Sequence, residues 1–317
     1  MSFLNFCISI FSFKITPKYF VLNFLATLIF LFLVAFILKQ LDFKITNNDI
    51  IKSYQIEKIK SKKFQEINTI FVGDSSGGNA INNVYFNKLS DLKSENLCLT
   101  GSWGLNGSLG IIKKAFEKNK NIKNIIIIQT LDIWEREYSK ESILELFTLN
   151  EQFQLLDNIS IISNLFNLKE IWWHLKYITT KDKLQKIDLE NDYLLQREEK
   201  YSNNKLYIKD HENFNKIKIS QSKNKELKML EVYCKDNSLN CIFLNGPIHK
   251  NFLTRSIEFK KYINSKIEKQ FSHIKYYNDL FIYEQNKIGD SYDHVDIKYK
   301  NESTLDYFKL LQNELVY

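Results

Sequence analysis

An uncharged segment near the N-terminus constrains this chain more than any other feature. From Phe20 to Leu38, the 19 residues FVLNFLATLIFLFLVAFIL carry no charge. A helix of this length, at ~1.5 Å per residue, approaches the ~30 Å hydrocarbon thickness of a bilayer. The residues that follow, KQLDFKIT, contain no small-x-small cleavage site, which favours an uncleaved anchor over a signal peptide. We expect an N-terminal segment at 1–19 and a transmembrane anchor at 20–38. A buried core helix is the alternative.

Lysines on both sides of this run leave its orientation open. Cys234 and Cys241 flank a short polar stretch, and two outcomes stay open for them, a disulfide and a pair of free thiols. A disulfide would suit an oxidising compartment, so we favour a single-pass protein of the inner (cytoplasmic) membrane with a periplasmic or other extracytoplasmic body. The charged residues 39–66 are expected to form a solvated juxtamembrane connector.

The composition is that of a globular protein with few tight turns. Of 317 residues 44% are hydrophobic, and only nine are Gly and two Pro, which argues against an all-β architecture. The net charge of +7 comes from lysines mixed with Asn, Ile and Glu along the whole chain. We therefore expect no nucleic-acid partner.

Short apolar runs alternate with helical patterns from residue 67 to 317. Runs that are apolar throughout indicate strands covered on both faces, and the helices between them indicate right-handed crossovers in a parallel sheet. The strands are expected at Thr69–Val72, Leu97–Leu99, Ile125–Ile128 and Ile242–Leu244, with a weaker one near Leu280–Tyr283. The helices are expected at Asn79–Leu92, Leu109–Lys118, Lys223–Lys235, Thr254–Phe271 and Ser303–Leu315. This pattern predicts a three-layer α/β domain. A mostly helical insertion at about 135–219 interrupts it, packed at the sheet edge or folded over the carboxyl ends of the strands.

Polar residues at the ends of the apolar runs are the candidates for chemistry, because open α/β sheets gather their working groups beyond the carboxyl ends of the strands. The first run ends in GDSSGGN, which makes Ser75 a candidate nucleophile; Ser76 could compete for that role, or these residues could serve only as helix caps. His294 stands before the last helical pattern, with Asp290 and Asp293 beside it, and is the best candidate base. His249 follows the fourth run and could line the same cleft.

These residues resemble the SGNH (GDSL-type) hydrolase superfamily, whose members share a flavodoxin-like parallel sheet. The resemblance rests on GDS after the first strand, a glycine after the second and an Asp-rich His before the C-terminal helix. It implies that Ser75 is the nucleophile and that its own N–H forms part of the oxyanion hole. It also implies that His294 is the base and that Gly101 or Gly104 is the second-block glycine.

Two positions depart from the family pattern. The third block usually reads Gly-x-Asn-Asp, but here the chain has Gln129-Thr130-Leu131-Asp132, so Leu131 stands where an oxyanion-hole Asn is expected. Gln129 or Asn106 would have to supply the amide instead. The family's acid stands three residues before the histidine, where this chain has Ser291, so either Asp290 or Asp293 could orient His294. No Cys or His pair has zinc-ligand spacing, and we expect no metal and no cofactor.

A membrane anchor joined to an SGNH-like body is similar to accessory proteins of cell-envelope O-acetylation. This resemblance implies an anchored serine esterase or O-acyltransferase that acts on an acylated envelope glycan. In such systems a multi-span membrane acyltransferase delivers the acyl group, which makes one a candidate partner. The alternative is a non-catalytic SGNH-like scaffold or glycan-binding protein of a surface-polysaccharide pathway, with Leu131 and Ser291 as traces of lost chemistry.

Overall fold

The computed structural model describes residues 17–40, 47–165, 186–188, 194–196, 220–252 and 272–317, with four isolated helical positions between 257 and 265. The described residues fall into two compact units. One lies within Met1–Ile45 and Asp157–Asp182. The other, here called the α/β unit, lies within Thr46–Leu156 and Lys183–Tyr317.

The first unit contains helices α2 (Pro17–Gln40) and α9 (Asn158–Leu165). Helix α2 covers the apolar run, and its large apolar side chains between Tyr19 and Phe30 are exposed in this unit. Across the residues that the structure describes, no helix combines the length and the apolar character needed to cross a membrane. The membrane anchor at 20–38 stays a prediction from the sequence.

The α/β unit is built on a five-stranded parallel sheet with the order β2-β1-β3-β6-β8. Every residue of β1 and β3 is buried, which explains why their sequences are apolar throughout rather than alternating. The order and the parallel pairing agree with a flavodoxin-like fold and confirm the predicted α/β class. The strands are β1 (Thr69–Gly73), β2 (Ser94–Asn96), β3 (Asn124–Gln129), β6 (Asn240–Asn245) and β8 (Ile274–Tyr277).

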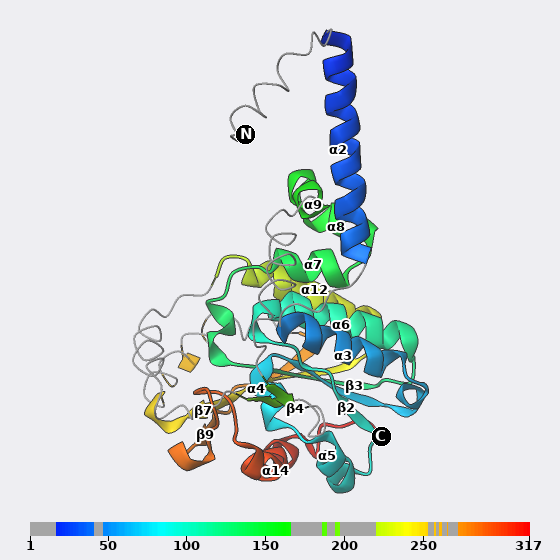
Figure 1. The fold of residues 1–317 in the computed structure, drawn as a ribbon. Coiled ribbons are helices and arrows are strands. Elements are labelled where there is room, and N and C mark those ends of the chain that lie inside the picture. The colour runs from blue at the N-terminus through cyan, green and yellow to red at the C-terminus, as the bar shows by residue number, and fades with distance from the viewer. Residues whose placement is uncertain are drawn as a thin grey trace. The chain divides into compact units, whose positions relative to one another are not determined.

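Helices cover both faces of this sheet and form the predicted three layers (Figure 1). The core is continuous between the sheet and the helices. The ring of Phe71 packs edge-on against that of Phe86, with the ring centroids 4.8 Å apart, and Phe86 packs in the same way against Phe308, with the centroids 5.8 Å apart. One face carries α3 (Asn47–Lys60), α6 (Gly104–Lys118) and α12 (Lys223–Asp236), and the other carries α5 (Asn83–Ser90) and α14 (Lys300–Leu311). A short helix, α4 (Ser75–Ala80), follows β1 directly.

Two strand predictions need correction. The second strand lies at Ser94–Asn96, just before the predicted Leu97–Leu99, although the N–H groups of Leu97 and Leu99 still donate to β1 carbonyls at 2.8 and 2.9 Å. The fifth strand of the sheet is β8, which was not predicted. It is an edge strand and only partly buried, so its sequence is not an apolar run. The run near Leu280–Tyr283 forms β9 (Phe281–Tyr283), which pairs instead with β7 (Pro247–His249) in a separate two-stranded sheet.

Residues 47–66 are part of the α/β unit, so the prediction of a solvated connector is wrong for them. Ile51 and Phe64 are fully buried, and the Gln55 side chain donates to the carbonyl of Cys98 at 2.8 Å. Lys58 forms an ion pair with Glu95 at 2.7 Å. These contacts join α3 to β2 and to the residues that follow it, and the 3₁₀ turn η1 (Lys62–Glu66) comes after α3 in the chain.

The insertion is described in part. It contributes α7 (Lys140–Leu146), α8 (Leu149–Leu155) and an antiparallel hairpin of β4 (Lys186–Asp188) and β5 (Leu194–Gln196). Strand β5 contacts α4, the helix that follows β1, which agrees with an insertion folded over the carboxyl ends of the strands. Residues 166–185, 189–193 and 197–219 of the insertion, and most of the helix predicted at 254–271, lie outside the described part of the chain.

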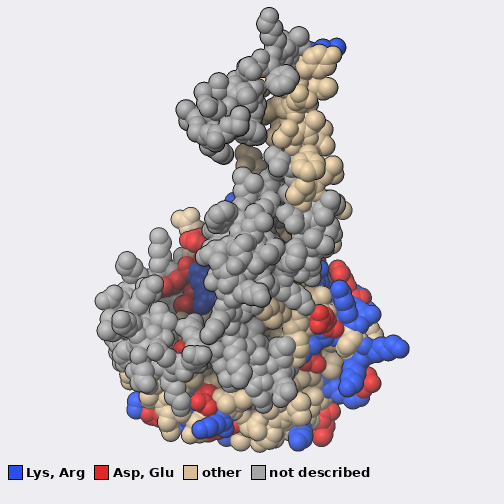
Figure 2. Space-filling view, viewed as in Figure 1, with Lys and Arg blue, Asp and Glu red and all other residues tan. Residues whose placement is uncertain are grey.

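A disulfide joins Cys234 in α12 to Cys241 in β6, with Cα atoms 6.3 Å apart. Of the two outcomes that the sequence left open for this pair, the structure has the covalent one. On the face shown in Figure 2, basic and acidic side chains of the α/β unit lie next to each other, so the excess positive charge does not gather there into one patch.

Candidate active site

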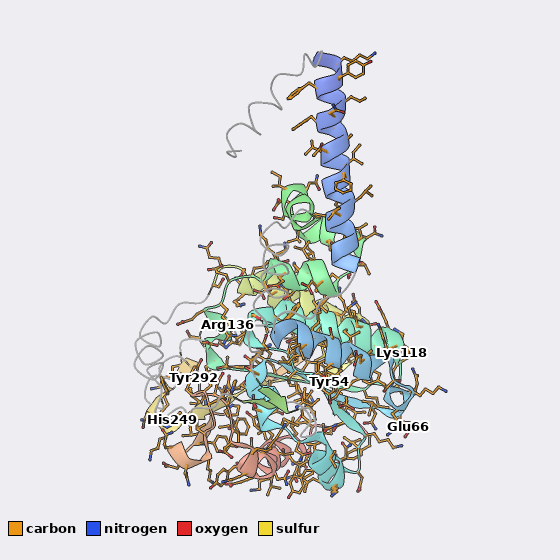
Figure 3. The ribbon with its side chains drawn as sticks, viewed as in Figure 1. Tyr54, Glu66, Lys118, Arg136, His249 and Tyr292 are labelled. Carbon is orange, nitrogen blue, oxygen red and sulfur yellow. A yellow bond between two sulfur atoms is a disulfide. The ribbon has the colours of Figure 1, made fainter. Side chains whose placement is uncertain are left out.

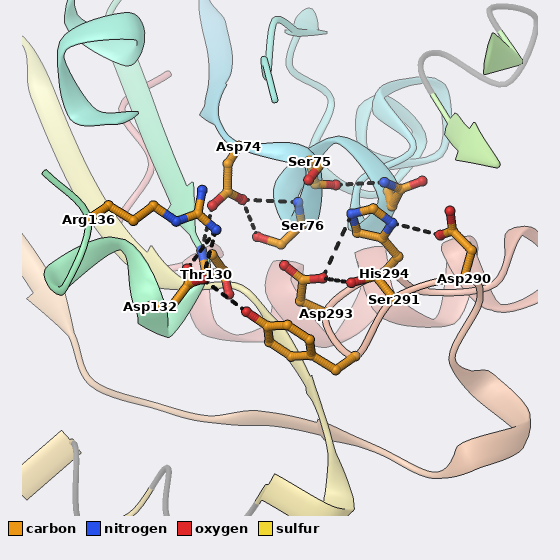
Figure 4. Close-up of polar contacts among 12 residues, drawn as sticks. Asp74, Ser75, Ser76, Thr130, Asp132, Arg136, Asp290, Ser291, Asp293 and His294 are labelled. Carbon is orange, nitrogen blue, oxygen red and sulfur yellow. Dashed lines mark hydrogen bonds and ion pairs between the residues drawn. The ribbon is translucent and has the colours of Figure 1, made fainter. Parts of the chain in front are cut away.

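The loops that follow the strands bring the candidate residues to one end of the sheet. In Figure 3, Arg136, Tyr292 and His249 lie at this carboxyl end, while Glu66 and Lys118 lie at the amino end. Figure 4 shows the turn after β1 and the segment before α14 meeting there, although more than 200 residues separate them in sequence. The charge of Asp293 also acts on Asp74, so the two segments are electrostatically coupled.

The backbone conformation of Gly73 and the hydrogen bonds of Asp74 fix the turn after β1. Gly73 has φ +146°, and a Cβ there would lie 1.7 Å from the carbonyl oxygen of Ile128. Asp74 caps α4: its Oδ1 accepts from the N–H and the Oγ–H of Ser76 at 3.0 and 2.5 Å, and its Oδ2 accepts from the N–H of Thr130 at 3.0 Å. Burial raises the pKa of Asp74 to about 6, and the charge of Asp293 acts in the same direction against that of Arg136.

Ser75 and Ser76 differ in accessibility. Ser76 is fully buried, and a Cβ at Gly246 would lie only 2.2 Å from its Oγ, so neighbouring backbone covers this hydroxyl. Ser75 is partly exposed, and its carbonyl accepts from the Asn79 amide at 2.7 Å. The structure therefore commits the hydroxyl of Ser76 to the Asp74 cap and leaves Ser75 as the serine open to a substrate.

His294 forms a buried hydrogen bond with Asp290. The Nδ1 atom lies 2.7 Å from Oδ1 of Asp290, and the two residues are only 4% and 6% exposed. When Asp290 is ionised, its carboxylate accepts from the N–H at Nδ1, and the lone pair of the imidazole lies on Nε2. Asp293 lies farther away, with Oδ1 3.8 Å from Nε2, and it accepts from the hydroxyl of Ser291 at 2.6 Å. Asp290 is thus the acid that orients the imidazole.

A turn explains why the acid stands four residues before the histidine instead of three. The N–H of Gly289 donates to the carbonyl of His294 at 2.8 Å, and Ile288 and Val295 form an antiparallel bridge. These bonds close residues 288–295 into a compact loop. The loop folds the carboxylate at position 290 back onto the imidazole.

A second polar network lies beside the β1 turn and was not identified from the sequence. Asp132, in the 3₁₀ turn η3 (Leu131–Trp134) after β3, accepts from the Tyr292 hydroxyl at 3.1 Å and from Nη2 of Arg136 at 2.9 Å. Arg136 is one of three arginines in a chain that otherwise uses lysine for positive charge. This choice of residue was the available signal, since a guanidinium is selected where several directed donors are needed.

The other residues predicted to bind substrate or an oxyanion occupy varied positions. Gly101 begins the 3₁₀ turn η2 (Gly101–Trp103) and lies against Arg136. Gly104 begins α6 with φ +59°. Asn106 and Gln129 are 0% and 1% exposed, and the Gln129 amide donates to Ser108 at 2.9 Å, so neither amide is open to a substrate.

His249 is fully buried and committed to local contacts. Its Nε2 lies 2.5 Å from Oε1 of Gln285, and its Nδ1 accepts from the N–H of Asn251 at 3.0 Å. Burial lowers the pKa of this imidazole, which keeps it neutral. We therefore leave His249 out of the proposed site.

No family model, no curated protein and no solved structure matches this chain. Among the residues that the structure describes, no group of three or more His, Cys, Asp or Glu side chains is arranged to hold a metal ion. The geometry of the β1 turn and of the His294 loop is therefore the basis for assigning a function.

Proposed function

We propose that this protein is a serine esterase or O-acyltransferase whose substrate is an acylated glycan of the cell envelope. One observation carries the proposal: a buried Asp290–His294 hydrogen bond lies at the same sheet edge as the GDS turn that presents Ser75. Such a pair is what a serine hydroxyl needs to become a nucleophile, because the carboxylate fixes the tautomer and stabilises the imidazolium.

The reaction proceeds in two halves. Nε2 of His294 takes the proton of Ser75 as Oγ attacks the ester carbonyl carbon, and the carbonyl electron pair moves onto oxygen. The tetrahedral anion collapses, the C–O bond of the leaving alcohol breaks, and His294 returns the proton to that alcohol. Water or a sugar hydroxyl then attacks the acyl-serine, again through His294, and releases a carboxylic acid or a new ester together with free Ser75.

The resemblance to SGNH hydrolases assigns the N–H groups of Ser75 and Gly101 to the developing oxyanion. Donors aimed at that charge supply much of the rate enhancement in acyl transfer. The disulfide between Cys234 and Cys241 supports an extracytoplasmic location, since disulfides persist in oxidising compartments. Attachment to the membrane through residues 20–38 and a multi-span acyltransferase partner stay predictions from the sequence.

A fluorophosphonate probe tests the proposal directly. We expect the probe to label the wild-type protein and the variant Ser102→Ala, which removes an exposed serine near the site, but not Ser75→Ala. Hydrolysis of p-nitrophenyl acetate should follow the same pattern. A wild-type protein that takes no label and hydrolyses no acetyl ester would refute the proposal and favour a non-catalytic scaffold.

A further inference from the structure

The proposed site lacks one donor. Three groups usually stabilise the oxyanion in SGNH hydrolases, but the position of the third-block Asn is occupied here by Leu131, which is apolar and 1% exposed. The buried amides of Asn106 and Gln129 cannot replace it without leaving the core. The proposed reaction therefore needs a donor from another residue at the carboxyl end of the sheet.

Arg136 crosses the end of β1. It follows η3, on the β3 side of the sheet, yet its guanidinium lies on Gly101, which follows β2: a Cβ at Gly101 would be 1.8 Å from Nη1 and 2.8 Å from Cζ. Because β1 stands between β2 and β3, the guanidinium spans the end of β1, where Asp74 and Ser75 begin α4. Its charge also acts on Asp74, in agreement with this placement.

The guanidinium of Arg136 has N–H groups besides those that bind Asp132. Asp132 binds only Nη2, with its two carboxylate oxygens at 2.7 and 2.9 Å. Within the described part of the chain, Nη1 and Nε have no hydrogen-bond partner. The side chain is 30% exposed, in contrast to the buried amides of Asn106 and Gln129. Arg136 therefore presents positively charged N–H groups that a substrate can reach.

Neighbouring contacts hold this side chain in place and keep it charged. Asp132, which anchors Nη2, also accepts from Tyr292, so Arg136 is linked to the loop that carries His294. Burial acts to lower the pKa of Arg136, but the charges of Asp132 and Asp74 hold it above its ordinary value. A preorganised, permanently charged donor is the type of group that stabilises an oxyanion well.

We propose that Arg136 is the third oxyanion donor of this site and takes the place of the missing asparagine. Nη1 donates a hydrogen bond to the carbonyl oxygen as negative charge develops on it, beside the N–H groups of Ser75 and Gly101. No proton is transferred. The inference rests on the proposed function and adds a catalytic residue to it.

Kinetics provide the first test. Arg136→Met should lower kcat for p-nitrophenyl acetate by about 100-fold or more with little change in KM, because the interaction forms mainly in the transition state. Arg136→Lys should retain part of the activity, and added methylguanidinium should raise the rate of Arg136→Met. Lys93→Met, which removes an ion-paired cation before β2, is the matched control and should keep wild-type kcat. A folded Arg136→Met variant with wild-type kcat would overturn the inference.

Anion binding tests Arg136 independently of turnover. In a Ser75→Ala background, calorimetry with dimethylphosphinate, a tetrahedral monoanion, should show binding that weakens at least about tenfold when Arg136→Met is added. Equal affinities, or no binding to Ser75→Ala, would overturn the role of Arg136, while fluorophosphonate labelling of wild type could still support the esterase. Arg136-dependent binding by a protein that takes no label would show an anion site at Arg136 but refute the esterase, and with it the role of Arg136 as an oxyanion donor.

Discussion

Asp290 Oδ1 lies 2.7 Å from His294 Nδ1, and the two residues stand four positions apart in a closed loop. A spacing of three residues is the one that the resemblance to SGNH hydrolases implies, and Ser291 occupies that position here. The hydrogen bond from the N–H of Gly289 to the carbonyl of His294 closes this loop, so the carboxylate of Asp290 reaches the imidazole in spite of the extra residue. The departure at Ser291 therefore does not remove the acid from the site.

Asp290→Asn should lower kcat for an acetyl ester by on the order of 10³- to 10⁴-fold, because an amide in this position no longer selects the tautomer with Nδ1–H. Asp293→Asn is the matched control: the Asp293 carboxylate lies 3.8 Å from Nε2, beyond hydrogen-bond distance, so this variant should change kcat less than about tenfold. Steady-state kinetics on both variants decide the matter. A larger loss for Asp293→Asn would show that the acid has been assigned to the wrong residue.

Gly101→Ala should reduce turnover without unfolding the protein. A methyl group at position 101 occupies the space of Arg136 Nη1, and a side chain can move where backbone cannot. We expect kcat to fall toward the value of Arg136→Met and the double variant to be no worse than either single one. Circular dichroism monitors folding. Additive losses in the double variant would indicate that the two residues act separately.

Removal of the disulfide should destabilise the α/β unit. Cross-linking residues seven positions apart restricts the unfolded chain and stabilises the fold by about 2–3 kcal/mol on the chain-entropy estimate. Cys234→Ser with Cys241→Ser should therefore unfold at lower urea concentration and lose the response to reductant. Cys98→Ala retains the bridge and should keep that response. Alkylation of protein taken from cells without reductant should leave Cys234 and Cys241 unmodified, and modification of both would argue against an oxidising compartment.

Asp74 should make stability depend on pH between about 4 and 6. Burial raises its pKa in the folded protein to about 6, whereas the unfolded chain has the ordinary value of 3.8. The folded state thus retains a proton that the unfolded state has released, so this stabilisation is present below about pH 4 and is lost as the pH rises through 6. The unfolding free energy of wild type relative to Asp74→Ala should be about 2 kcal/mol greater at pH 4 than at pH 7. Urea titrations at both pH values measure the difference, and a constant difference would contradict the shifted pKa.

The sequence supported good predictions where the signal is local. The runs at Thr69–Val72, Ile125–Ile128 and Ile242–Leu244 are central strands because full burial requires apolar residues on both faces. The polar residues at their ends had to lie at one edge once the strands were parallel. Edge strands were harder: β2 is the polar segment Ser94–Asn96, and only the first residue of β8 is buried.

The residues of the candidate site also fall into two groups, those with a local sequence signal and those that only the tertiary structure brings together. Ser75 and His294 could be proposed as candidates from the amino-acid sequence alone, because a turn after a buried strand and a histidine among carboxylates are patterns of adjacent residues. The acid that binds His294, the burial of Ser76 and His249, and the reach of Arg136 across β1 to Gly101 were decided only by the tertiary structure. Each depends on how far a side chain extends between neighbouring strands and loops, and distances across a sheet are set by packing rather than by separation along the chain.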